Sequence, residues 1–206
     1  MKLHVVRASH NCRRALATAH HLGLDVEVVD VDLASGGHKA PEYLAINPNG
    51  KVPTLVDGDL HLWESNAIMQ YVASKKPGNE LWPDDPRARA EIVRWQFWEA
   101  NHLSNGTGGL TFQRVFKPFV LKQEPDEAAI AKATETFHTF APVLNAQLEG
   151  RKFVTGDALT LADFSVGANF SFAKPAQFPL QDYPHVRAWL DRLDEVPAWN
   201  ETAPKM

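Results

Sequence analysis

The chain has 206 residues, of which 44% are hydrophobic and 22% are charged, and its net charge at pH 7 is −4. This composition supports one large folded domain or two small ones, and it argues against a disordered chain. The lysines and arginines are scattered and no segment approaches the roughly 20 apolar residues of a membrane span, so we expect neither a nucleic-acid partner nor a membrane partner. The apolar run at the start is too short for a signal peptide, which predicts a cytoplasmic protein.

Strand and helix signals alternate over the first 75 residues. Alternating apolar residues predict a strand over 2–7, and the pattern of residues 9–22 predicts a helix that Gly23 ends. A second strand over 26–31 follows at once. Strand, helix and strand in this order predict two parallel strands joined by a right-handed crossover.

The next elements complete an α/β domain. A short helix is expected over 42–46, and strands over 54–56 and 61–63 flank an Asp-Gly pair, which is a strong hairpin signal. A helix over 65–74 closes the segment. The order β-α-β, α, β-β-α is that of a thioredoxin-like domain.

Prolines and a glycine crowd residues 77–86 and predict a linker, because proline ends helices and glycine loosens the chain. We therefore expect a first domain over 1–78 and a second over 87–206. Helical apolar spacing recurs throughout the second part without strand signals, so an all-α helical bundle is predicted. The glycine-rich stretch 105–109 is interpreted as a turn between helices or a kink.

Two short motifs stand on either side of the predicted hairpin. They are Asn47-Pro48-Asn49-Gly50-Lys51-Val52-Pro53 and Glu64-Ser65. At this spacing and in this element order, they resemble the glutathione-binding signature of glutathione transferases. The resemblance is strongest over 1–75 and 156–164 and weakest over 100–150. It implies a thioredoxin-like domain that binds glutathione and a helical domain that contributes a pocket for an electrophile.

The resemblance also implies how glutathione is held. Pro53 would be cis, and the N–H and C=O of Val52 would then pair with the cysteinyl backbone of glutathione. Ser65 and the first turn of its helix would hold the γ-glutamyl carboxylate, while Glu64 would face the α-amine. His38 and Lys39 match family positions that reach the glycyl carboxylate, and Lys51 is a further candidate cation for it. Taken alone, His38 fits a solvated loop histidine equally well.

The catalytic position is expected between the first strand and the first helix, where a thiolate meets the positive end of the helix dipole. Ser9, with Arg14 after it, resembles the serine-type transferases, especially the plant phi class and bacterial relatives, whose serine hydroxyl donates to the glutathione sulfur. Ser9 could instead serve only as a helix cap, and Asn11 could assist the sulfur or cap the helix. Cys12 matches the second cysteine of a C-x-x-C motif, but the attacking cysteine is replaced by serine, so we expect Cys12 to pack as a small hydrophobe.

The helical domain carries two further predictions. Thr160 and Asp163 form an expected capping box, with Leu159 against Phe164 as a hydrophobic staple, so Asp163 is assigned to folding. The electrophile pocket is assigned to His10 and three phenylalanines of segment 110–119, although core packing explains most aromatic residues of this domain. These phenylalanines are Phe112, Phe116 and Phe119.

The predicted function is conjugation of the glutathione thiolate to apolar electrophiles, in the manner of a detoxifying enzyme. We expect no cofactor beyond glutathione as co-substrate, and no metal, because the histidines form neither a His-Glu-x-x-His pattern nor a Cys/His cluster. The family implies a homodimer. Two alternatives stay open on the same fold: a glutathione-dependent peroxidase, dehalogenase or isomerase, and a non-catalytic glutathione-binding or assembly module.

Overall fold

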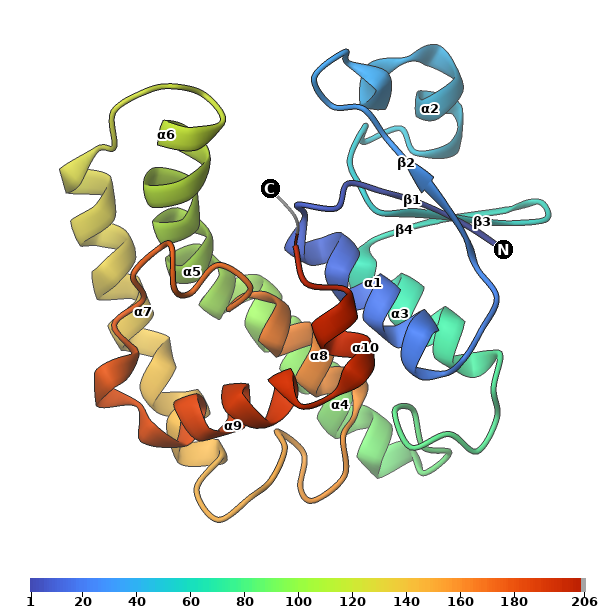
Figure 1. The fold of residues 1–206 in the computed structure, drawn as a ribbon. Helices are drawn as coiled ribbons and strands as arrows, with labels where there is room; N and C mark the ends of the chain where they lie inside the picture. The colour runs from blue at the N-terminus through green and yellow to red at the C-terminus, as the bar shows by residue number, and fades with distance from the viewer. Residues whose placement is uncertain (205–206) are drawn as a thin grey trace. The chain divides into compact units, whose positions relative to one another are not determined.

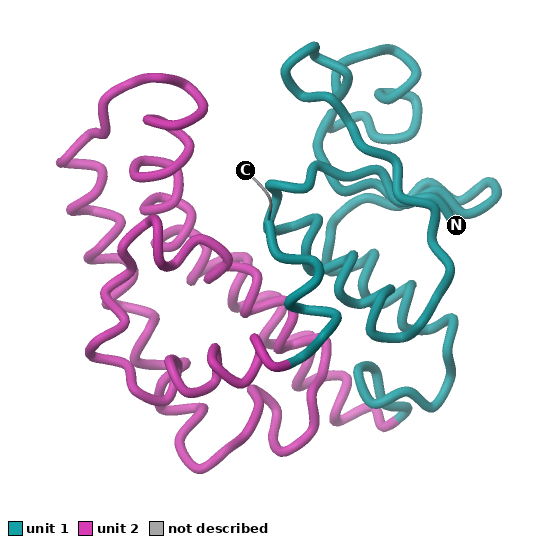
Figure 2. Tube along the Cα trace, viewed as in Figure 1, with its two compact units in different colours: residues 1–84, 196–206 teal, residues 85–195 magenta. Residues whose placement is uncertain are grey.

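The computed structural model describes residues 1–204, which divide into two compact units. Unit 1 comprises residues 1–84 and the chain from Val196 on, and unit 2 comprises residues 85–195 (Figure 2). The boundary at 84–85 lies inside the expected linker. The expected second domain over 87–206 includes the segment from Val196 on. In the structure, this segment groups with unit 1.

A contact within unit 1 explains this grouping. The short helix α10 (Pro197–Glu201) packs on α1 (His10–His21). The guanidinium of Arg13 lies 3.6 Å from the centroid of the Trp199 ring, and its Nη2 donates to the Trp199 carbonyl at 2.9 Å. Both residues are buried, so this stacked cation is part of the packing of unit 1.

Unit 1 is built on a four-stranded sheet with the strand order β2-β1-β3-β4. β2 is parallel to β1, whereas β3 and β4 are antiparallel to their neighbours, so the expected β-α-β crossover and hairpin are confirmed. The strands are β1 (Lys2–Val5), β2 (Glu27–Asp30), β3 (Thr54–Asp57) and β4 (Leu60–Trp63). The other helices of unit 1 are the 3₁₀ turn η1 (Gly37–Lys39), α2 (Pro41–Ile46) and α3 (Ser65–Ser74).

The two faces of this sheet are covered by different helices. α1 and α3 lie on one face and α2 lies on the other (Figure 1). Leu3, Val5 and Leu55 are fully buried in the core on the α1 side. His4 alternates to the opposite face, where its ring meets that of Tyr43 at 5.9 Å between centroids. The predicted thioredoxin-like arrangement is therefore confirmed.

Unit 2 is mainly helical in the described chain, which confirms the expected all-α second part. The β-pairing within it is an isolated bridge between Phe153 and Gly156. The first helical run is continuous from residue 86 to 119: α4 (Pro86–Trp98), the π turn η2 (Glu99–Leu103), α5 (Ser104–Thr111), the π turn η3 (Phe112–Phe116) and α6 (Lys117–Phe119). The later elements are α7 (Glu127–Gln147), α8 (Leu161–Ala168), the 3₁₀ turn η4 (Leu180–Asp182) and α9 (Pro184–Asp194).

The interpretation of residues 105–109 as a turn between helices is wrong, because they lie inside α5. Their glycines allow α5 to approach α7 closely. A Cβ on Gly106 would lie 2.7 Å from the backbone nitrogen of Phe137, and one on Gly109 would lie 2.8 Å from the Cβ of Ala133. The glycines therefore serve packing between helices rather than a break in the chain.

The capping box of α8 is present as predicted. Asp163 is fully buried, and its Oδ2 accepts from the backbone N–H of Thr160 at 2.9 Å. Its Oδ1 accepts from the N–H of Val154 at 2.8 Å and from Nε1 of Trp189 at 3.0 Å. Burial raises the pKa of Asp163 to about 6, although these hydrogen bonds act in the opposite direction. Asp163 therefore ties α8 to α9 and to the preceding loop.

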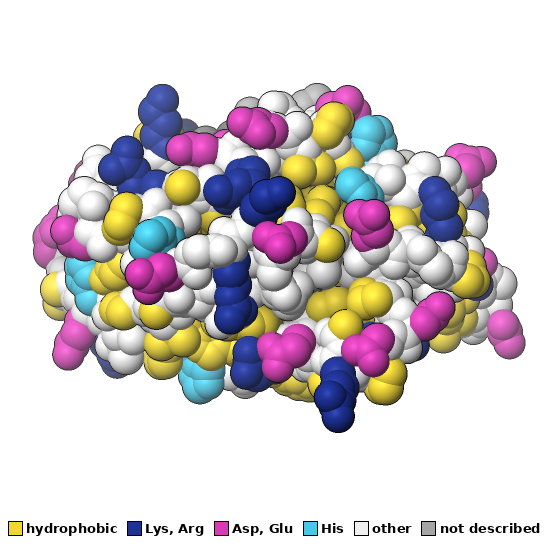
Figure 3. All heavy atoms as spheres, turned by 90° about the horizontal axis from the view of Figure 1, so that it is seen from below, with side chains coloured by type: hydrophobic (Ala, Val, Ile, Leu, Met, Phe, Trp, Pro, Cys, Tyr) yellow, Lys and Arg dark blue, Asp and Glu magenta, His cyan; other side chains and the backbone are white. Residues whose placement is uncertain are grey.

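Among residues 1–204, no helix is long and apolar enough to cross a membrane. The same residues contain no group of three His, Cys, Asp or Glu side chains placed to hold a metal ion. On the face drawn in Figure 3, acidic and basic side chains are interspersed without a large patch of one sign.

Candidate functional site

Three segments of unit 1 meet at one end of its sheet. The strand β1 runs toward the loop before α1, and His4 near its end pairs with Thr54 at the start of β3. Thr54 pairs in turn with Trp63 at the end of β4. This register brings together the loop after β1, the loop before β3 and the turn after β4. They contain the predicted residues Ser9, Val52, Pro53, Glu64 and Ser65.

Ser9 is the N-cap of α1. Its Oγ accepts from the backbone N–H of Cys12 at 3.4 Å, and its backbone is extended, with φ −88° and ψ 121°. A hydroxyl that accepts this bond keeps its own proton for donation to a further acceptor. Ser9 therefore caps the helix, and its hydroxyl lies at the positive end of the helix dipole.

Asn11 and Cys12 lie within the first turn of α1, beyond the capping position. Because Ser9 takes the N-cap, Asn11 is not the cap of this helix; its side chain is half-buried. Cys12 is fully buried, and its Sγ accepts from the N–H of Val6 at 3.4 Å. Burial raises the pKa of the Cys12 thiol to about 11, partly offset by hydrogen bonding to Val6 and Ser9. The thiol is thus protonated and uncharged at neutral pH, which is consistent with the expected role of Cys12 as a small hydrophobic residue in the core.

The Val52–Pro53 peptide bond is cis, as the family resemblance implied. The carbonyl of Lys51 just before it accepts from the hydroxyl of Tyr43 at 2.7 Å and from Nδ2 of Asn47 at 2.8 Å. The same Asn47 atom also donates to Oγ1 of the buried Thr54 at 2.8 Å. These hydrogen bonds hold the loop that presents Val52.

The residues of η1 lie against this loop. Gly50 has a φ of +58°, and a Cβ there would lie 2.8 Å from Nζ of Lys39 and 2.9 Å from the carbonyl oxygen of His38. His38 is half-buried, and its Nδ1 is buried with no hydrogen-bond partner among the described residues. Lys39 and Lys51 are exposed. The structure therefore brings the Lys39 ammonium and the backbone of His38 to the loop that precedes Val52.

The turn before α3 has an unusual backbone. Glu64 adopts φ 72° and ψ 111°, which a residue with a side chain rarely adopts, and such strain often accompanies a ligand site. Ser65 is the first helical residue, and no described side chain caps the helix. Its first N–H groups thus form a place where an anion binds favourably.

Arg14 links the two helices that begin at this end of the sheet. It is 2% exposed, and its Nη1 donates to Oδ1 of Asn66 at 3.2 Å. Asn66 directly follows Ser65, so this hydrogen bond connects α1 to the first turn of α3. Arg14 also places a positive charge close to both helix N-termini.

The residues predicted for the electrophile pocket are divided between the units. His10 begins α1 in unit 1 and is half-buried. Phe112 and Phe119 of unit 2 are 46% and 63% exposed, whereas Phe116 packs edge-on against Phe172 at 5.5 Å between ring centroids. Within unit 2, the two exposed rings offer apolar surface for a ligand.

Comparison with known families identifies the chain. The family model described as the N-terminal domain of glutathione S-transferase matches residues 1–74, and the model of the C-terminal domain matches residues 127–192. A probable glutathione S-transferase of rice, Oryza sativa subsp. japonica, is 35% identical across 100% of this chain and 97% of its own length. This chain belongs to the glutathione S-transferase family.

Other relatives of this glutathione S-transferase come from plants and bacteria, as expected. Glutathione S-transferase 3 of Zea mays is 37% identical over 98% of this chain and 92% of its own. The structure of glutathione S-transferase I from maize with an atrazine–glutathione conjugate has a TM-score of 0.88 and 34% identity, covering 98% of this chain and 95% of that one. The theta-class enzyme of Xanthomonas axonopodis pv. citri with glutathione bound has a TM-score of 0.86 and 32% identity, covering 100% and 97%.

Sequence reasoning about this transferase missed the residues that support the site. Tyr43 lies outside both sequence motifs and Asn47 is the first residue of one, yet both hold the Lys51 carbonyl. The Asn-Pro pair before the loop indicated a turn, but nothing in the local pattern indicated that the Tyr43 hydroxyl would reach across from α2.

Proposed function

We propose that this transferase binds glutathione along Val52 and uses the Ser9 hydroxyl to stabilise the glutathione thiolate, which then attacks an apolar electrophile. The observation that carries the proposal is the position of Ser9. It caps α1 at the sheet end where the backbone of Val52, followed by a cis proline, and the uncapped start of α3 also lie.

The chemistry of each segment suits one part of glutathione. Val52 can pair with the cysteinyl backbone as an added strand does, while Ser65 and the first turn of α3 bind the γ-glutamyl carboxylate. The Glu64 carboxylate faces the α-amine in this proposal. His38, Lys39 and Lys51 supply donors and positive charge for the glycyl carboxylate; among the described residues, the buried Nδ1 of His38 has no hydrogen-bond partner.

The magnitudes show that a hydroxyl is sufficient without a general base. Lowering a thiol pKa from about 8.5 to about 6.5 requires roughly 2.7 kcal/mol. A hydrogen bond to a charged acceptor supplies about 1.5 to 3 kcal/mol, and a helix N-terminus supplies about 0.3 to 2 kcal/mol. The thiolate fraction at pH 7 would rise from about 3% to about 75%.

The remaining parts of the proposal concern the electrophile, the assembly and the compartment. His10 with Phe112, Phe116 and Phe119 would bind the apolar co-substrate, since aromatic surface attracts such molecules with little directional demand. We further propose a cytoplasmic homodimer that needs glutathione and no additional cofactor.

Glutathione binding is tested by calorimetry on Ser65→Ala and on the matched control Ser74→Ala, which changes the last residue of the same helix. Ser65→Ala should weaken binding about tenfold, because a hydrogen bond to a charged group is lost. The control should bind as the unchanged protein does. Equal affinity in all three proteins would remove the Ser65 hydroxyl from the site, and no binding at millimolar glutathione would contradict the proposed function.

Catalysis is tested by conjugation of 1-chloro-2,4-dinitrobenzene and by titration of the bound thiol through thiolate absorbance. Ser9→Ala should lower kcat/KM by up to about 25-fold near pH 7, because losing the hydroxyl raises the thiol pKa by up to about two units, whereas Ser9→Thr, which keeps a hydroxyl, should retain most activity. Asn11→Ala, measured in parallel, assigns the donor. An unshifted thiol pKa in Ser9→Ala together with a raised one in Asn11→Ala would transfer the role to Asn11.

A further inference from the structure

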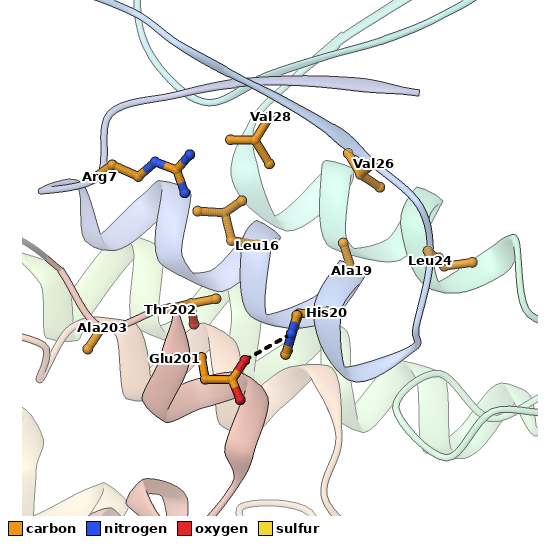
Figure 4. Close-up of a pocket in the computed structure, with 10 residues that line it drawn as sticks. All are labelled: Arg7, Leu16, Ala19, His20, Leu24, Val26, Val28, Glu201, Thr202 and Ala203. Atoms are coloured by element: carbon orange, nitrogen blue, oxygen red, sulfur yellow. Dashed lines mark ion pairs between the residues drawn. The ribbon is translucent and has the colours of Figure 1, made fainter.

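Helix α10 is attached to α1 at two places, about two helical turns apart. Toward the C-terminal end of α1, Nε2 of His20 lies 3.0 Å from a carboxylate oxygen of Glu201, and Figure 4 shows these two side chains pointing toward each other from the two helices. In the first turns of α1, Arg13 meets Trp199. Both side chains of the His20 pair are more than half exposed, whereas Arg13 and Trp199 are 6% and 2% exposed. Water therefore screens the first contact and is excluded from the second.

The Arg13 side chain makes two separate contacts with Trp199. Its guanidinium stacks on the indole ring, 3.6 Å from the ring centroid, and its Nη2 donates to the Trp199 carbonyl at 2.9 Å. A guanidinium that both stacks and donates is fixed in its plane as well as in its position. The contact thus immobilises a side chain that has large rotamer freedom when it is exposed.

Arg13 is also the residue whose backbone closes the first turn of α1. Its N–H donates to the Ser9 carbonyl at 2.9 Å, and the N–H of Cys12 donates to the Ser9 hydroxyl oxygen at 3.4 Å. The ends of a helix fray easily, because several of their backbone groups have no partner within the helix. Fixing Arg13 from the side of α10 therefore limits the movement of Ser9 relative to α1.

We propose that Arg13 and Trp199 are positioning residues for Ser9, through which the C-terminal helix helps to set the pKa of the bound glutathione thiol. The inference rests on the role proposed for Ser9 above. Trp199 holds Arg13, Arg13 holds the Ser9 carbonyl, and the Ser9 hydroxyl keeps the geometry in which it donates to the sulfur. Hydrogen bonds weaken steeply as their geometry departs from the optimum, so a small displacement of Ser9 raises the thiol pKa.

Titration of the bound thiol through thiolate absorbance tests the proposal. Trp199→Leu removes the ring and keeps an apolar side chain, whereas Arg13→Lys keeps the charge and loses the planar stack. Each should raise the pKa of the bound thiol by about half to one unit, and Trp199→Phe, which keeps a ring face for the cation, by less than about 0.3 units. An unchanged thiol pKa in both Trp199→Leu and Arg13→Lys would overturn the proposal.

The pH dependence of conjugation distinguishes positioning from a loss of folded protein. If the thiol pKa rises by half to one unit from about 6.5, kcat/KM for 1-chloro-2,4-dinitrobenzene should fall about three- to eightfold at pH 6. Near pH 8.5, where nearly all bound thiol is ionised, it should approach that of the unchanged protein. A loss of folded enzyme lowers both rates by the same factor, so an equal reduction at the two pH values would contradict the proposal.

Two matched controls isolate the buried contact. Glu201→Gln breaks the other attachment of α10 to α1, and Trp189→Leu removes a fully buried tryptophan from unit 2. Both should leave the thiol pKa unchanged, although Trp189→Leu also leaves a cavity in a core. A pKa raised equally in either control would overturn the assignment to Arg13 and Trp199. If Trp199→Leu does not fold, Arg13→Lys, which leaves the Trp199 ring in place, decides alone.

Ser9→Ala in the same titration separates this inference from the proposed function. A raised thiol pKa in Ser9→Ala, with an unchanged one in Arg13→Lys and Trp199→Leu, would overturn only the positioning role. An unchanged thiol pKa in Ser9→Ala would contradict the proposed role of Ser9 itself, and the positioning role with it.

Discussion

Single residues at the start of α1 have sharply different surroundings. Ser9 keeps a hydroxyl at the helix end, whereas Cys12, three residues later, is fully buried beneath it. The same turn thus separates a group that can meet a ligand from one that cannot. In this Ser-x-x-Cys pattern the serine is therefore the residue at the helix end, while the cysteine contributes packing.

The buried thiol of Cys12 should be almost inert in the folded protein. Its pKa of about 11 leaves about 0.1% thiolate at pH 8, compared with about a quarter for an unperturbed cysteine, so alkylation should slow by at least about 200-fold. Mass spectrometry after iodoacetamide treatment measures the rate, with the urea-unfolded chain as the control. Comparable rates in the two states would show that the thiol is exposed or activated.

Among the helices, α5 and α7 show how side-chain size limits packing. Gly106→Ala should destabilise the protein by about 1 to 3 kcal/mol, because its Cβ would lie 2.7 Å from the Phe137 backbone, which cannot yield as a flexible side chain does. Gly108→Ala in the same helix meets nothing within 4 Å and should stabilise by about 0.5 to 1 kcal/mol. Urea unfolding of both variants checks the opposite signs, and a shared sign would contradict the close approach.

The start of α8 depends on one carboxylate. Asp163→Asn replaces one of two acceptor oxygens with an amide donor. Either Thr160, or Val154 and Trp189, then lose their buried acceptor, which should cost about 3 kcal/mol. Asp157→Asn, in the same motif but exposed, should change the unfolding free energy by less than about 0.5 kcal/mol. Similar unfolding midpoints for the two variants would show that Asp163 is not the anchor of this helix.

Asp163 should also make stability depend on pH in an unusual direction. Burial raises its pKa from 3.8 to about 6, so the folded protein binds the proton more tightly than the unfolded chain does. The contribution of this group is therefore complete below about pH 4 and is lost as the pH rises through about 6. Unfolding free energies of the unchanged protein and Asp163→Asn over this interval isolate the effect, which should be missing from the variant.

At the scale of the whole molecule, the proposed dimer can be tested at an exposed aromatic side chain of unit 2. Phe97 on α4 is 67% exposed, so it is the side chain we choose to test as part of the interface. Light scattering after gel filtration should give a dimer mass for the unchanged protein and a monomer mass for Phe97→Asp. Phe119→Asp, at a residue that is 63% exposed, should stay dimeric and instead raise the KM for the electrophile. A dimer in both variants would place the interface elsewhere.

The sequence by itself determined the order of the elements, the hairpin, the capping box of α8 and the two motifs, since each is encoded by residues close together in the chain. Only the tertiary structure showed that residues 105–109 are helical, that the chain from Val196 joins unit 1, and that Tyr43 supports the loop before Val52. These features depend on contacts between residues far apart in sequence. Local periodicity reports propensity and amphipathic faces, whereas packing decides whether a glycine breaks a helix or lets it approach a neighbour.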